Sequence, residues 1–216
     1  MNLLSTASLF SFFTIISRIF GYVRDILIAI FLGASIFADA FFVAFRLPNT
    51  FRRLFSEGTF NAAFIPSYIA AKIQDKKKGK KFADNVLSLL LLTLILVVTL
   101  AEIFTPYLVY IIAPGFTENE IKFELAVELT RITFPFLLFV SLSSFFSGIL
   151  NSNNKFAAAA AAPIILNIFL IISLIVSYFF DLNFVRQLSY GVTLAGFIQL
   201  IFLAYVTLKF YKPNLV

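Results

Sequence analysis

The sequence predicts an all-α, polytopic membrane protein, and two observations support this fold class. Of the 216 residues, 61% are hydrophobic and only 13% are charged, a composition far from that of soluble domains. The apolar residues also gather into long segments separated by short polar stretches, and about 20 apolar residues suffice to cross a bilayer. We therefore expect one domain, residues 1–216, of six transmembrane helices. They span residues 3–32, 36–70, 84–113, 121–150, 156–180 and 187–210.

The first two predicted helices are apolar but carry charged residues. The segment 3–32 is interrupted by charges in its second half and is followed by Gly33, a residue type that commonly ends helices. The segment 36–70 is polar along one side and contains Pro48. A basic loop, 74–81, then separates it from the third segment.

The remaining four predicted helices are more uniformly apolar. The segment 84–113 contains one isolated charge, Glu102, and ends before a Pro-Gly pair. Charges in 121–150 are confined to its first turns, and 156–180 has none at all. The segment 187–210 is the last one long enough to span a bilayer.

The lysines predict the orientation of these helices. With six crossings, the loops after the second and fourth helices and the tail share one side of the membrane, and this side receives nine lysines. The other side holds only Lys122 and Arg186. The positive-inside rule then places both termini in the cytoplasm, although the basic loop could also contact lipid headgroups. The nine lysines are Lys72, Lys76, Lys77, Lys78, Lys80, Lys81, Lys155, Lys209 and Lys212.

Eight charged residues concentrate in the first two predicted helices. A charge in mid-bilayer costs about 2.5–3.5 kcal/mol, so eight facing lipid would cost roughly 20–25 kcal/mol, more than the ~5–15 kcal/mol that stabilises a typical domain. Most of them must therefore line a polar interior, pair with one another or reach an interface. Their net charge of +2 favours a hydrated cavity for an anion. They are Arg18, Arg24, Asp25, Asp39, Arg46, Arg52, Arg53 and Glu57.

Helical spacing places several of these charges on shared faces. Asp39, Arg46 and Arg53 are seven residues apart and Glu57 follows four later, so they form one stripe with Thr50. On an ideal helix Arg18 and Asp25 also share a face, whereas Arg24 and Arg52 lie off these stripes. A kink at Pro48 would change the phasing in the second helix.

The charges of the first two predicted helices could be ion pairs that hold these helices together. Because arginines outnumber acids and bind phosphate bidentately, a functional role is the alternative. Glu102 is either a structural carboxylate or a coupling-ion or proton site.

Several classes of function lack the residues they need. The chain has no His and no Cys, which removes the commonest metal ligand, the usual proton shuttle and any thiol nucleophile. It also has no Walker A loop and no GxSxG motif. We therefore expect no enzyme, no cofactor and no metal. The net charge of +6 comes mainly from loop lysines and these arginines, and does not indicate nucleic-acid binding.

The residues at this point resemble those of a known family. The stretch SRIFGYVRDILIAIFLGASIFADAFFVAFRLPNTFRRLFSEGTFNAAFIP, Ser17 to Pro66, closely resembles the opening of the bacterial MurJ (MviN) lipid II flippases. The motifs APGF, ITFPF and GILN continue the likeness in order, from Ala113, Ile132 and Gly148 respectively. The resemblance implies an inner-membrane transporter of two lobes, which moves lipid II by alternating access through a cationic cavity. This chain would be the N-terminal lobe.

The resemblance also implies roles for individual residues. Arg18, Arg24 and Arg52 resemble cavity arginines that meet the pyrophosphate or headgroup, and Asp25 would position Arg24. The remaining charges of the cluster would support the cavity or a gate between lobes: Asp39, Arg46, Arg53 and Glu57. The family favours Arg52 over Arg53 as the cavity residue, whereas ideal helical phasing favours Arg53.

The family's chains are longer and carry a second lobe that this sequence lacks. A fragment, one half of a split transporter that needs a partner chain, and a half that pairs with itself would each explain this. The functional alternatives are export of another polyprenyl-pyrophosphate glycan and a non-transporting remnant or scaffold.

Overall fold

The computed structural model confirms an all-helical fold with no strand in the part of the chain that it describes, residues 3–57 and 59–215. The side chains of residues 3–7, 51–57 and 59 are outside that description. Nine α-helices and one short 3-10 helix occur within it. They are α1 (Leu3–Leu32), α2 (Ile36–Glu57), α3 (Thr59–Gln74), α4 (Lys76–Ile103), α5 (Thr105–Ile112), η1 (Pro114–Glu118), α6 (Glu120–Thr133), α7 (Phe136–Ser152), α8 (Phe156–Phe179) and α9 (Phe184–Thr207).

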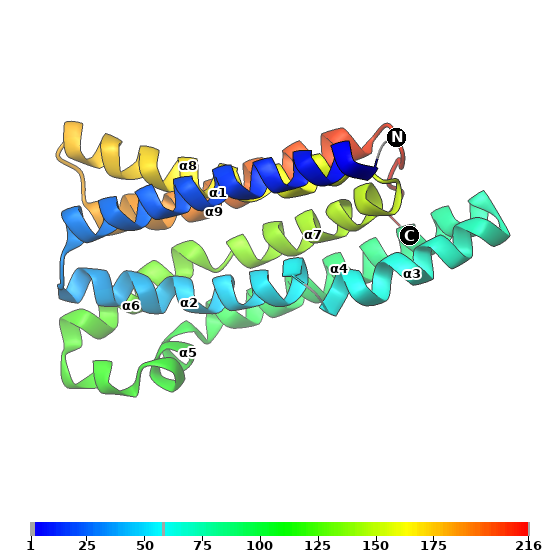
Figure 1. The fold of residues 1–216 in the computed structure, drawn as a ribbon. Helices are drawn as coiled ribbons and strands as arrows, with labels where there is room; N and C mark the ends of the chain where they lie inside the picture. Colours follow the sequence, from blue (N-terminus) through cyan, green and yellow to red (C-terminus); the bar gives the residue numbers. More distant parts are fainter. Residues whose placement is uncertain (1–2, 58, 216) are drawn as a thin grey trace.

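The helices form an elongated bundle (Figure 1). Helices α1, α8 and α9 lie together, α7 packs against α9, and α2 and α6 pack against each other below them. The α3–α4 hairpin extends from one end of the bundle. That end also carries both termini and the α7–α8 turn, so the segments richest in lysine gather there (Figure 1).

Four segments of the described chain are long and apolar enough to cross a membrane: Lys76–Ile103, Glu120–Ser152, Phe156–Phe179 and Phe184–Thr207. These correspond to the last four of the six predicted crossings. Neither α1 nor α2 is among the four segments found within the described residues.

The structure divides three of the predicted helices. The segment 36–70 consists of α2 and α3, 84–113 contains the end of α4 and α5, and 121–150 contains α6 and α7. Prolines account for the last two breaks. Pro106 and Pro135 have no N–H, so the carbonyls four residues earlier lose their helical partners.

Two helices begin three or more residues earlier than predicted because side chains cap their first turns, and the predicted ends at 70 and 210 lie at Gln74 and Thr207. The basic segment 74–81, expected as a loop, is mostly the first turns of α4, since the Asp75 carboxylate accepts a hydrogen bond from the Lys77 backbone N–H at 2.9 Å. Similarly, Asn183 accepts from the Arg186 backbone N–H at 3.1 Å, and α9 begins at Phe184 and not at residue 187.

Candidate functional site

The candidate site is a hollow of about 580 Å³ enclosed by α1, α2, α3, α7, α8 and α9. Its lining is mixed, with apolar residues, two arginines and a large group of uncharged polar side chains. The polar and charged lining residues are Thr14, Ser17, Arg18, Arg24, Asn49, Asn61, Ser147, Asn151, Asn167 and Gln199.

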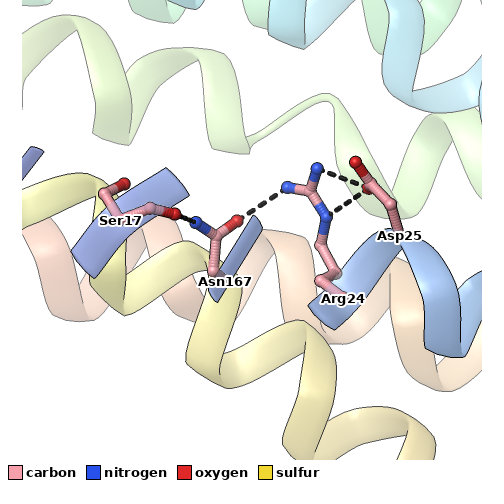
Figure 2. A network of polar contacts seen from close by, with 4 residues as sticks. All are labelled: Ser17, Arg24, Asp25 and Asn167. Atoms are coloured by element: carbon pink, nitrogen blue, oxygen red, sulfur yellow. Dashed lines mark hydrogen bonds and ion pairs between the residues drawn. The ribbon is translucent and has the colours of Figure 1, made fainter. Parts of the chain in front are cut away.

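Arg24 is held in this hollow by partners on two helices (Figure 2). Its Nη1 donates to Asn167 Oδ1 on α8 at 2.7 Å. Its Nε and Nη2 donate to Asp25 Oδ1 at 2.9 and 2.7 Å. Asn167 is itself fixed, because its Nδ2 donates to the Ser17 carbonyl of α1 at 2.9 Å. The guanidinium is thereby oriented before any ligand arrives.

The positioning role that the resemblance implied for Asp25 has a matching geometry. The Asp25 side chain remains 64% exposed, against 21% for Arg24, and Asp25 is not among the residues that line the hollow. The carboxylate therefore holds Arg24 from the side, and no acidic side chain among the described residues lines the hollow.

Arg18 lies in the same hollow but in a different environment. It is exposed, and its side chain makes no hydrogen bond or ion pair with any residue that the structure describes. All five guanidinium N–H donors are therefore available to a ligand. The two arginines come from one helix, six residues apart, and are the only charged lining residues within the described chain.

The amides of the hollow were missed by the sequence reasoning. Asn167 lies within the uncharged fifth segment, whose apolar character hides it. Asn61 and Asn151 each have a buried Oδ1 with no hydrogen-bond partner among the described residues. Asn151 belongs to the GILN motif and follows a long apolar segment, and an amide in that position could have indicated a polar lining residue. Buried amides without partners cost free energy unless water or a ligand satisfies them.

Asp39 and Arg46 do not join this hollow. Asp39, in the first turn of α2, forms an ion pair with Lys122 of α6 at 2.6 Å. Arg46 is exposed and has no side-chain partner within the described part of the chain. The predicted stripe thus begins with a structural ion pair. The side chains of its later members Arg53 and Glu57, and that of Arg52, fall outside the described residues.

Glu102 is also separate from the hollow. It is half-buried near the end of α4, and its Oε1 is buried without a hydrogen-bond partner in the described chain. Arg131 of α6 interacts with it electrostatically but not within ion-pair distance. The described residues include no group of three or more acidic side chains placed to hold a metal ion.

Four segments of the described chain can cross a membrane, and the bundle surrounds a hollow lined by two arginines and several amides. These features define the class of the protein as a polytopic membrane protein. The family model for the lipid II flippase MurJ matches residues 28–214. The chain therefore belongs to the lipid II flippase MurJ family, a family of transporters and not of enzymes.

Individual relatives agree with this assignment. A probable lipid II flippase MurJ from Rickettsia prowazekii (strain Madrid E) is 43% identical over 204 residues, covering 94% of this chain and 40% of the relative. One from Rhizobium tropici is 44% identical over 193 residues, covering 87% and 36%. A solved lipid II flippase MurJ in an inward closed conformation aligns with a TM-score of 0.84 at 29% identity, covering 96% of this chain and 43% of that one. The chain thus spans about 40% of the length of these relatives.

Proposed function

We propose that the chain acts as the N-terminal lobe of a lipid II flippase, and that its hollow binds the pyrophosphate of lipid II. One observation carries this proposal: Arg24 and Arg18 face one polar hollow that no acidic side chain lines within the described residues. An anion that leaves water for such a site needs charged donors, and guanidinium groups bind phosphate oxygens with the shortest and strongest hydrogen bonds.

The two arginines would divide this work. Three N–H donors of Arg24 are used by Asn167 and Asp25, so Arg24 offers a fixed direction with two donors left over. Arg18 offers all five donors on a side chain without partners in the described chain. We infer that Arg24 orients the pyrophosphate and that Arg18 closes onto it.

The neighbouring amides suit the rest of a glycan headgroup. The Oδ1 atoms of Asn61 and Asn151 have no hydrogen-bond partner among the described residues, and sugar hydroxyls and peptide N–H groups are donors that would satisfy them. The hollow's 580 Å³ is in the range of small-molecule pockets, about 300–1,000 Å³. It would therefore hold the pyrophosphate and adjoining groups, while the polyprenyl chain stays in the membrane.

The remaining roles are proposals that follow from the family. Arg52 would be a third cavity arginine, and the residues that support the cavity or gate would be Asp39, Arg46, Arg53 and Glu57. The chain would lie in the bacterial cytoplasmic membrane with both termini inside, and a second lobe, from another chain or a second copy, would complete the transport path. The lysine-rich end of the bundle would face the cytoplasm.

Genetic rescue tests the transport function. The host's own lipid II flippase is depleted, and this chain is expressed alone or beside a separately encoded second lobe. We expect rescue with the second lobe and loss of that rescue in Arg24→Ala at equal membrane abundance. Normal rescue by Arg24→Ala would remove Arg24 from the substrate site, and failure of both arrangements would contradict the flippase function.

A binding measurement tests the site without transport. We expect the purified chain to bind a polyprenyl pyrophosphate more tightly than the neutral polyprenol, with the difference shrinking at high salt because ionic screening weakens charge attraction. Equal affinity for both lipids would show that the arginines serve structure alone.

A further inference from the structure

A second concave surface lies on the outside of the bundle, between α6–α7 and α9. It consists of two adjoining hollows of about 460 and 550 Å³. They share three lining residues, Arg131, Ile132 and Tyr190, and therefore form one continuous groove. None of the residues that line it also lines the hollow around Arg24.

One half of this groove is charged. Glu124, Glu128 and Arg131 line it. Glu128 is already paired with Arg186, at 2.7 Å to Nε and 2.9 Å to Nη2. Glu124 and Arg131 are exposed, and neither side chain has a hydrogen bond or ion pair within the described chain. Within the described residues, the charged half therefore presents one acid, Glu124, and one base, Arg131, that are free of direct side-chain bonds, although Glu102 lies close enough to Arg131 to interact with it beyond ion-pair distance.

The other half is apolar. Pro135 and Phe139 line it on one side, and Leu194 and Phe197 on the other. Leu194 and Phe197 are 50% and 44% exposed. The hydroxyl of Thr193, which also lines this half, donates to the Ile132 carbonyl and so is already satisfied.

The order of these groups along the groove is informative. Glu124 precedes Arg131 by seven residues, two helical turns on one face and about 10 Å along the axis. The apolar half continues from Arg131 past the break at Pro135 to Phe139 of α7, with Leu194 and Phe197 of α9 on its other side. An acid, a base and an apolar trough thus follow one another from the end of the bundle toward its middle.

We propose that this groove binds a membrane phospholipid with an ethanolamine headgroup. Its ammonium lies against Glu124, its phosphate against Arg131, and an acyl chain along Phe139, Leu194 and Phe197. The chemistry of such a lipid runs in the same order as the chemistry of the groove. A phospholipid whose headgroup carries no cationic group, such as phosphatidylglycerol, would match Arg131 but leave Glu124 unpaired. This site is independent of the proposed transport function.

Native mass spectrometry of the detergent-purified chain tests the site with three probes: phosphatidylethanolamine, phosphatidylglycerol and diacylglycerol. We expect phosphatidylethanolamine to be retained best and diacylglycerol, which lacks phosphate, to be retained least. Arg131→Gln should lower retention of both phospholipids about tenfold, since it removes charge-assisted hydrogen bonds. Glu124→Gln should abolish only the preference for phosphatidylethanolamine over phosphatidylglycerol.

Two further variants keep the test specific. Leu194→Trp should lower retention with both charges intact, because it fills the apolar half. Lys209→Gln removes a charge at the opposite end of the bundle and should change nothing. Thermal unfolding of each variant in detergent verifies that it is folded. Unchanged retention in folded Arg131→Gln, or equal retention of diacylglycerol and the phospholipids, would overturn the proposal.

Discussion

At the residue scale, the arrangement around Arg24 depends on one uncharged side chain. Asn167 joins two helices, because it accepts from Arg24 Nη1 at 2.7 Å and donates to the Ser17 carbonyl at 2.9 Å. A Cβ at Gly21 would lie 3.5 Å from the Asn167 amide nitrogen, an ordinary van der Waals contact, so the hydrogen bonds and not the glycine fix this arrangement. The arginine thus gains a defined direction from a helix far away in the sequence.

We predict that Asn167→Ala weakens binding of polyprenyl pyrophosphate about tenfold. The substitution removes a hydrogen bond to a charged group, worth about 1.5–3 kcal/mol, and lets the guanidinium swing toward Asp25. Titration of the purified chain with the lipid measures the effect. Asn85→Ala, at an exposed position on α4, is the matched control, and equal affinities for the two variants would contradict the role of Asn167.

At the element scale, the segment after α9 is fastened to the start of α4 by Asp84. This buried carboxylate accepts from Tyr211 Oη at 2.6 Å, from the Asn214 backbone N–H at 3.0 Å and from Lys80 Nζ at 2.7 Å. Burial and the adjacent carboxylate raise the pKa of the Tyr211 hydroxyl well above its usual value, so the hydroxyl stays protonated and continues to donate. The contact ties the last described residues to a helix that begins more than 100 positions earlier.

We therefore expect Asp84→Ala to lower the free energy of unfolding by roughly 2–4 kcal/mol, because it leaves buried donors without their acceptor. Tyr211→Phe, which removes one hydrogen bond and keeps the ring against Phe145, should cost only about 1 kcal/mol. Unfolding in detergent is the measurement. Glu118→Ala, at an exposed carboxylate of η1, serves as the control; a loss in Asp84→Ala no larger than the control's would argue against the fastening role.

Close packing of α8 and α9 also belongs to this scale. A Cβ on Gly191 would collide with the Ser173 side chain and lie 3.5 Å from the Phe169 carbonyl oxygen. Gly191→Val should therefore destabilise the protein by about 1–3 kcal/mol through overpacking. Gly115→Ala is the matched control because nothing lies within 4 Å of its added Cβ. Equal unfolding transitions in the two variants would contradict close packing of α8 and α9 at Gly191.

At the scale of the whole molecule, the bundle has two chemically different ends. Both termini, the α3–α4 hairpin and the α7–α8 turn lie at one end (Figure 1), and these segments contain most of the lysines. The α1–α2 connection, η1 and the α8–α9 turn lie at the other. If the positive-inside rule governs insertion, the lysine-rich end faces the cytoplasm.

Cysteine labelling tests this orientation, and the absence of native cysteine makes each introduced thiol unique. We predict that a membrane-impermeant maleimide added to intact cells labels Glu118→Cys but not Lys77→Cys. After permeabilisation both should react. The reverse pattern would mean that the bundle inserts in the opposite orientation.

Sequence patterns predicted the helical membrane fold well, because hydropathy over long windows is a local property. They predicted the breaks within helices less well. Pro135 and the caps at Asp75 and Asn183 act through single hydrogen bonds, which a window of mean hydropathy does not register. Similarly, the seven-residue spacing predicted that Asp39 and Arg46 belong to one polar stripe, whereas Asp39 forms an ion pair with Lys122 on another helix.

The sequence by itself determined that this chain is a helical membrane protein with an excess of arginine in its first helices, because both facts follow from residue type and spacing. Only the tertiary structure decided which charges share a hollow and which are neutralised elsewhere. Arg18 and Arg24 line the hollow, Asp25 holds Arg24 from its side, and Asn167 completes the site from a helix 143 positions away. Such partnerships depend on how helices pack, and a local pattern carries no information about a contact between segments so far apart.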